Sequence, residues 1–131
     1  MSLYFEDFEV GARFPTYGRT ITEGDLSLFC SFAGYHVPLF IDEEYAKKTP
    51  FGGRIVPSAM IMTLSTGMTE SLFRTTMIAL LALERGRFLH PVKPGDTITT
   101  EVEVLDKRET SKPDRGIVIF RDHLLNQRDE T

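Results

Sequence analysis

The stretch between residues 35 and 44 holds most of the side chains that could carry chemistry. It offers the phenol of Tyr35, the imidazole of His36 and the three carboxylates of Asp42-Glu43-Glu44. Histidine titrates near neutral pH, and paired carboxylates move protons at many sites. The acidic run has a simpler interpretation as the start of a helix that ends in two lysines, because the helix dipole favours these charges at its two ends.

Other reactive residues are isolated in the sequence. Cys30 and Ser58 have no nearby base that would activate them as nucleophiles. His36, His90 and His123 show no metal-ligand spacing, and the chain has no CxxC, HExxH or glycine-rich phosphate-binding motif. We therefore expect neither a metal ion nor a cofactor.

Two helices are predicted on either side of this stretch. The first follows Thr22, which can cap it, and it presents one apolar stripe before Gly34 ends it. The second runs from Pro57 or Ser58 to about residue 72, and its many small side chains are typical of a helix around which a sheet curls. Its predicted inner stripe is Ile61, Leu64, Met68 and Leu72.

Four stretches are predicted to form strands. They are residues 13–21, the apolar run 76–83, the alternating run 98–104 and the run 116–125. Periodicity does not separate strand from helix in residues 76–83, so the strand assignment there depends on length. The order of strand, two helices and then antiparallel strands predicts an α+β fold, with residues 1–131 as one domain.

The composition restricts the classes of protein to which this chain can belong. The chain is 41% hydrophobic and has a single cysteine, which fits a globular domain without an internal disulfide. We see no signal segment and no apolar run of membrane-spanning length, so we expect a cytoplasmic location. The net charge of −4 has the wrong sign for steering toward nucleic acid or an anionic membrane, and neither is expected as a partner.

Several motifs occur together in the order and spacing of a known family. They are YFEDFEVGARF, TITEGDLSLFCSFAG, PLFIDEEYAKKTPFGGRIV and GRFLHPVKPGDTI, and they cover nearly the whole chain. With them the sequence resembles the MaoC-like hydratases and dehydratases. The resemblance implies a hotdog fold, in which an antiparallel sheet wraps around a central helix. It also implies an acyl thioester of CoA or acyl carrier protein as ligand, and a homodimer or a heterodimer with a related subunit.

The resemblance also locates the site. The family's hydratase pattern, Gly-Asp-x-Asn/His-Pro-Leu-His-x-Asp, falls on residues 34–42, where Tyr35 stands at the aspartate, Val37 at the asparagine or histidine, and Phe40 at the catalytic histidine. A phenol with an ordinary pKa of about 10 is a weak base at neutral pH, and a phenylalanine moves no proton. His36, one position from the pattern, is the substitute candidate for the base, with Tyr35 as proton donor.

A second departure lies at the start of the central helix, where Pro57-Ser58 replaces the family's His-Gly. The resemblance implies that this helix end presents a backbone N–H to the thioester oxygen, and Ser58 still supplies one. Val37 and Pro38 join Pro57 and Ser58 as the predicted substrate-binding residues. The family typically continues past the NQRDET segment, residues 126–131, into one more strand, so the resemblance implies a sheet without its final strand in this sequence.

Two functions follow from the resemblance. The first is a hydratase or dehydratase of acyl thioesters such as enoyl-CoA, in which Tyr35 and His36 act as substitutes, and a hotdog thioesterase is a variant of this class. The second is a non-catalytic subunit that binds the acyl chain within a heteromeric dehydratase, or a stand-alone binding module.

Overall fold

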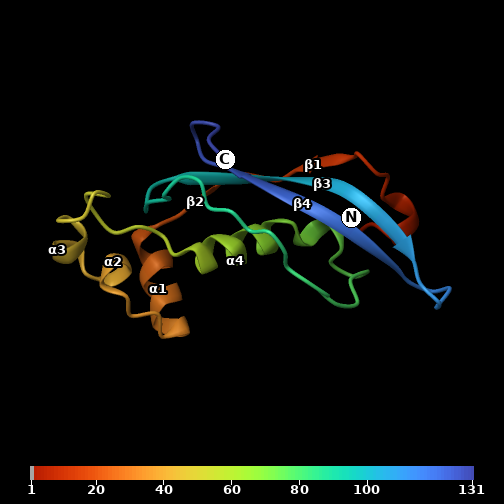
Figure 1. Ribbon diagram of the computed structural model, residues 1–131, viewed down its shortest axis with the longest axis horizontal. Coiled ribbons are helices and arrows are strands. Elements are labelled where there is room, and N and C mark those ends of the chain that lie inside the picture. Colours follow the sequence, from red (N-terminus) through yellow and green to blue (C-terminus); the bar gives the residue numbers. More distant parts are fainter. Residues whose placement is uncertain (1) are drawn as a thin grey trace.

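The computed structural model describes residues 2–131 and places a curved antiparallel sheet over one central helix (Figure 1). The strands are β1 (Arg13–Pro15), β2 (Arg19–Thr20), β3 (Thr97–Glu109) and β4 (Gly116–Leu125). The helices are α1 (Glu23–Ala33), α2 (Pro38–Ile41), α3 (Glu43–Ala46) and α4 (Ser58–Met68), with 3₁₀ turns at Phe5–Asp7 and Glu70–Leu72. The predicted α+β fold, with a sheet wrapped around a central helix, is confirmed.

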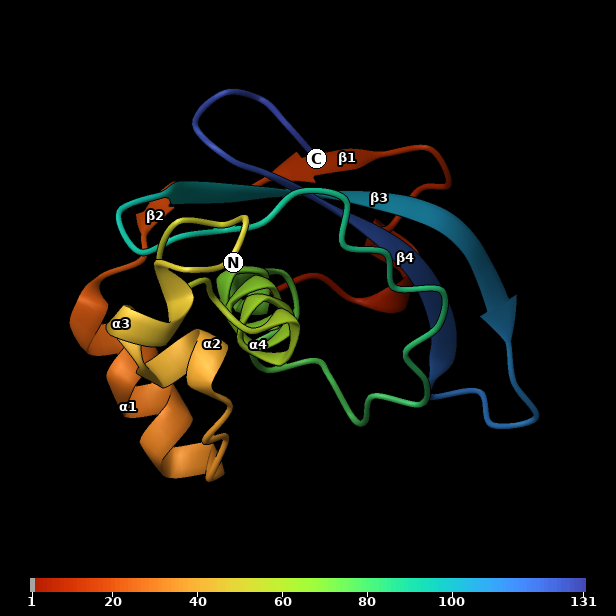
Figure 2. The ribbon, with the colours of Figure 1, turned by 60° about the vertical axis from the view of Figure 1, so that its left-hand side comes forward.

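The hairpin of β3 and β4 forms most of the sheet. Val102 lies opposite Asp122 in its antiparallel register, and an irregularity after Val104 interrupts the pairing and lets β3 bend. Both β1 and β2 also pair antiparallel with β3. Figure 2 looks nearly along α4 and shows the hairpin curving over the helix. In the described residues, β4 pairs with β3 alone.

The core lies between the concave face of the sheet and α4. Every second residue of β3 from Ile98 to Val104 is almost fully buried, whereas the residues between them are half-buried, as expected for a strand with one covered face. Helix α4 buries Met60, Ile61, Ser65 and Met68. The predicted inner stripe is therefore correct at Ile61 and Met68, while Leu64 is half-buried and the helix ends at Met68.

Two strand predictions need correction. The predicted strand at residues 13–21 is two short strands, β1 and β2, with residues 16–18 between them. The predicted strand at residues 76–83 is wrong, because residues 77–89 form neither helix nor strand. Ile78 and Leu81 there are 69% and 71% exposed. An apolar run becomes a strand only where a neighbouring strand takes up its backbone hydrogen bonds, and no strand of residues 2–131 does so here.

The helices of residues 2–131 include none that is both long and apolar enough to cross a bilayer.

Candidate functional site

The turn after α1 sets the direction in which Tyr35 leaves the helix. Gly34 has φ +66°, a left-handed conformation that glycine adopts without steric cost. Its N–H donates to the carbonyls of Cys30 and Ser31, and the Tyr35 N–H donates to the Cys30 carbonyl over 2.9 Å. The predicted end of this helix at Gly34 is confirmed, and so is its cap at Thr22, whose hydroxyl accepts from a backbone N–H.

Tyr35 and Phe40 form an aromatic pair. Their ring centroids are 5.1 Å apart and their planes are inclined by 86°, the edge-to-face geometry that aromatic rings favour. Phe40 is half-buried on α2 and packs against the main core, whereas Tyr35 is 38% exposed. The structure thus brings together the two residues that stand at the aspartate and histidine of the hydratase pattern.

The residues between the two rings face solvent. His36, Val37 and Pro38 are all exposed, and the His36 N–H donates to the Gly34 carbonyl over 3.1 Å. The His36 imidazole has no hydrogen bond or ion pair to any part of residues 2–131. Among the described residues, no polar side chain therefore orients the substitute base predicted from the sequence.

The start of α4 offers free backbone donors. Pro57 is the residue before the helix and is buried, and Ser58 is the first helical residue and is exposed. The first internal hydrogen bonds run from the N–H groups of Met60 and Ile61 to the Pro57 carbonyl, over 3.0 and 3.1 Å. The N–H groups of Ser58 and Ala59 have no acceptor within the helix and point out of its positive end. This helix end suits a carbonyl oxygen that gains negative charge.

Two backbone hydrogen bonds attach the aromatic pair's segment and the sheet to the entry of α4. The Ile55 N–H donates to the carbonyl of Leu39, next to Phe40, over 3.4 Å. The Val56 N–H donates to the Val92 carbonyl over 2.7 Å. The segment of residues 54–57 is therefore held on one side by α2 and on the other by the approach to β3.

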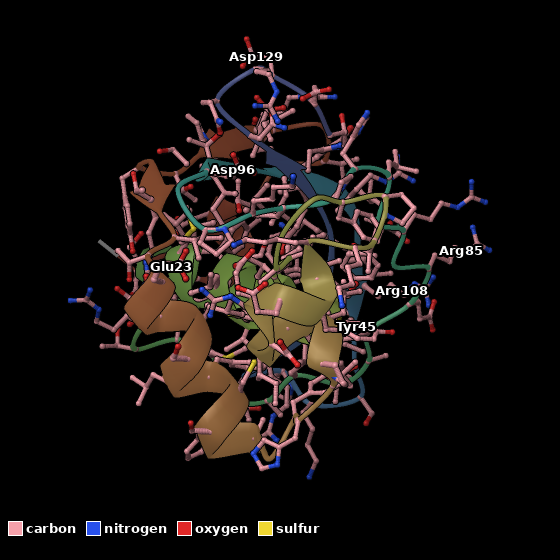
Figure 3. All side chains as sticks on the ribbon, turned by 90° about the vertical axis from the view of Figure 1, so that its left-hand side faces the viewer. Glu23, Tyr45, Arg85, Asp96, Arg108 and Asp129 are labelled. Carbon is pink, nitrogen blue, oxygen red and sulfur yellow. The ribbon has the colours of Figure 1, made fainter. Side chains whose placement is uncertain are left out.

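Arg54 joins three elements around this entry, a role that the sequence analysis did not assign. Its Nε donates to Glu43 Oε1 of α3 over 2.9 Å, and its guanidinium also donates to Glu23 at the start of α1. Figure 3 shows this end of the molecule, with Glu23 labelled. The hydrogen bond from Arg54 lowers the pKa of Glu43. The signal in the sequence was a single arginine ten residues after Glu44, beyond the two lysines that follow the acidic run.

The carboxylates of the acidic run have structural roles. Asp42 Oδ1 accepts from the Tyr45 N–H over 3.0 Å and so caps α3, and Glu43 binds Arg54. The interpretation of this run as a helix start is confirmed. Cys30 is buried, and burial raises the pKa of its thiol, which makes it a poor nucleophile.

The other two histidines lie away from the aromatic pair's segment and have partners of their own. His90 Nδ1 is 3.0 Å from the Thr131 carbonyl oxygen, and His123 Nε2 is 3.1 Å from Glu103 Oε1. Across residues 2–131, no three side chains of the metal-binding types gather as they would around an ion.

Comparison with known proteins agrees with the geometry. The sequence model of the protein family described as MaoC like domain matches residues 7–119. Protein MaoC of Klebsiella aerogenes is 35% identical over 113 residues, which are 86% of this chain and 33% of that protein. An (R)-specific enoyl-CoA hydratase of Rhodospirillum rubrum is 31% identical over 121 residues, 90% of this chain and 78% of that protein. The chain spans about a third of the length of the first curated relatives that it matches.

Solved structures show the same fold. The X-ray structure of a monoamine oxidase regulatory protein from Archaeoglobus fulgius matches with a TM-score of 0.90 at 32% identity, over 99% of this chain and 88% of that one. A double hotdog protein of Mycobacterium tuberculosis matches with a TM-score of 0.81 at 23% identity, over 98% of this chain and 41% of that one. The fold is a hotdog fold, and the relatives include hydratases and dehydratases of CoA thioesters. From the family match over most of its length, we conclude that the chain belongs to the MaoC-like domain family.

Proposed function

We propose that this chain binds acyl thioesters of CoA or acyl carrier protein at the start of α4, and that alone it does not activate water on them. The observation that carries the proposal is the edge-to-face contact of Tyr35 with Phe40. Two rings in contact at these positions leave no carboxylate and no imidazole to hold a water and take its proton. The thioester-binding frame is kept, while the water-activating groups are replaced.

The binding half of the proposal depends on α4. A thioester oxygen accepts hydrogen bonds, and the N–H groups of Ser58 and Ala59 are donors at the positive end of this helix. Val37 and Pro38 offer exposed apolar surface on the segment that α2 ties to residue 55. We place the acyl thioester between these two parts, with its oxygen toward Ser58.

A partner completes the proposed function. Within residues 2–131, β4 pairs with β3 alone, and residues 77–89 expose a run of large apolar side chains. Unpaired strand edges and apolar patches of this kind invite association. We propose a dimer, formed either by two copies or with a related hotdog subunit that retains the aspartate and the histidine.

A second candidate is a hydratase, or a thioesterase, that uses His36 as base and Tyr35 as proton donor. Both side chains are open to a ligand, which favours this candidate. A general base also needs a fixed orientation, and within the described part of the chain the imidazole has no polar partner to provide it. The first proposal therefore agrees better with the geometry.

Crotonyl-CoA distinguishes these functions. We expect the chain to bind crotonyl-CoA in a calorimetric titration and to hydrate it at least about 10²-fold more slowly than the (R)-specific enoyl-CoA hydratase of Rhodospirillum rubrum does. Ordinary turnover that disappears in His36→Ala would establish the second candidate instead. Absence of binding would overturn the thioester site itself.

A further inference from the structure

The outer side of α1 exposes two large apolar side chains. Leu28 is 71% exposed and Phe32 is 90% exposed, whereas Leu26 and Cys30 of the same helix are buried in the core. A single exposed apolar side chain is ordinary, but residues four positions apart in a helix lie on the same face. Leu28 and Phe32 therefore form an apolar ridge that the rest of residues 2–131 leaves largely uncovered.

A groove lies beside this ridge, between α1 and α4. Its volume is about 340 Å³, and Phe29, Met60 and Leu64 contribute to its apolar lining. An engineered apolar cavity of about 150 Å³ accepts benzene, so this groove has room for a phenyl ring. Among the described residues that line it, only Arg19 and Asp25 are charged, and they form an ion pair over 3.2 Å.

The charges of α1 neither attract a strongly charged partner nor repel a second copy. Residues 26–33 include no charged side chain. The two carboxylates of the helix, Glu23 and Asp25, lie in its first turn and pair with Arg54 and Arg19. Two copies that meet with antiparallel α1 helices keep these carboxylates at opposite ends of the contact, so like charges stay apart. A charged partner would gain little from a face whose charges are already paired.

The ridge and the groove lie side by side, which makes this face self-complementary. In a two-fold pair both copies present the same patch, so each copy can place its ridge in the groove of the other. We propose that the groove between α1 and α4 binds a second copy of this chain, with Phe32 of each copy seated in the groove of the other. Aromatic side chains that fill a pocket at the centre of an interface carry much of its binding energy.

The area of this face fits a small interface. An aromatic side chain buries about 150–250 Å², so the two Phe32 rings account for about 300–500 Å². The accessible parts of Leu28, Phe29 and Thr63 on both copies bring the total to about 1,000 Å², the lower bound of a biological interface. We therefore expect a weak association that becomes populated only at higher protein concentration.

This face is separate from the dimer contact proposed above. Figure 2 shows α1 on one side of α4 and residues 77–89 on the other side. The two contacts use different parts of the surface, so they can form together. Pairing through α1 would then join two of the proposed dimers.

Sedimentation velocity of the full chain between about 2 and 200 µM tests this pairing. We expect the mass of the smallest species to double reversibly, with a midpoint on the order of tens of micromolar. Phe32→Glu should raise the dissociation constant of this step about tenfold or more. Ser27→Glu adds the same charge to α1 away from the groove, so it is the matched control and should leave the doubling unchanged.

Thr63→Glu fills the groove from α4 and should act like Phe32→Glu, which it replaces if that variant loses its cooperative thermal transition. The proposal is overturned if the wild type does not double, if doubling persists in both groove variants, or if Ser27→Glu also abolishes it. A wild type that never doubles, yet binds the dye ANS in a way that Phe32→Glu abolishes, would assign the groove to a small apolar ligand instead. A smallest species that is a monomer contradicts the earlier dimer, whereas its doubling still supports pairing through α1.

Discussion

The combined change Tyr35→Asp with Phe40→His is expected to install water activation at the candidate site. The two rings are already in contact, with centroids 5.1 Å apart, so an aspartate and an imidazole in their places can reach one water between them. Positioned acid–base groups typically contribute about 10²–10⁴-fold to a rate. We expect hydration of crotonyl-CoA by the double variant to exceed that of the wild type by about 10²-fold or more.

The same change should cost stability. Loss of the edge-to-face contact lowers the free energy of unfolding by about 0.5–1.5 kcal/mol. Loss of the half-buried Phe40 ring lowers it further, by about half of the roughly 1.5–3 kcal/mol that a fully buried ring contributes. The sum of about 2 kcal/mol corresponds to a fall in Tm of about 6–8 °C for a domain of this size. The new polar groups are not fully desolvated, because Tyr35 is 38% exposed.

The assay follows the loss of the enoyl thioester absorbance, beside a thermal melt of each variant. Tyr35→Asp and Phe40→His alone are the controls, and each should gain little because each lacks half of the pair. Binding of butyryl-CoA, which cannot be hydrated, shows whether the thioester site persists. A double variant that folds, binds butyryl-CoA and still hydrates crotonyl-CoA no faster than the wild type would refute this reasoning.

Three further predictions concern the frame of the site. Arg54→Ala should lower Tm and weaken crotonyl-CoA binding, because Arg54 joins Glu43 to Glu23. Arg54→Lys should restore both only in part, since lysine lacks the forked guanidinium that binds the two carboxylates. Unchanged crotonyl-CoA binding in the alanine variant would contradict this prediction. The pKa values of Glu43 and Glu103 are lowered by hydrogen bonds from Arg54 and His123, so their contribution to stability is present above the ordinary glutamate pKa and is lost as the pH falls through the lowered values. Urea unfolding at about pH 6 and about pH 3.5 tests this, and we expect a lower midpoint urea concentration at the lower pH. Equal midpoints would contradict the prediction. Light scattering at micromolar concentration should report a dimer, and a stable monomer would count against the proposed assembly.

The sequence predicts the helices well where their ends carry local signals. Thr22 and Gly34 act through hydrogen bonds and backbone conformations within a few residues of themselves, so the bounds of α1 follow from the sequence alone. The alternation in residues 98–104 likewise reports one buried face and identifies β3.

The strand predicted at residues 76–83 does not form, for a reason that lies outside the segment. Its length and apolar character fit a buried strand, yet a strand exists only with a neighbour, and the sequence of the segment does not contain that neighbour. The same limit applies to residues 13–21, where the pairing partners on β3 determine that the strand divides into β1 and β2.

The candidate site was predictable in position but not in its contacts. The family pattern located Tyr35 and Phe40, and their direct ring contact emerges only when α2 turns back toward the end of α1. Arg54 was missed because its two partners lie 11 and 31 residues away in the sequence.

The two sides of the candidate site belong to parts of the molecule with different resistance to local unfolding. Phe40 lies on a four-residue helix, and α2 and α3 are attached to the rest by few hydrogen bonds, among them the Leu39 carbonyl to Ile55 and the ion pair of Glu43 with Arg54. The other side of the site is α4, which packs in the core against Ile98 of β3, part of the long β3–β4 ladder. Amide protons of α2 and α3 should therefore exchange with solvent through small openings that leave the ladder closed. Each such opening separates Phe40 from Tyr35 for a moment, so access to the thioester end of α4 can vary in time without any change in the sheet.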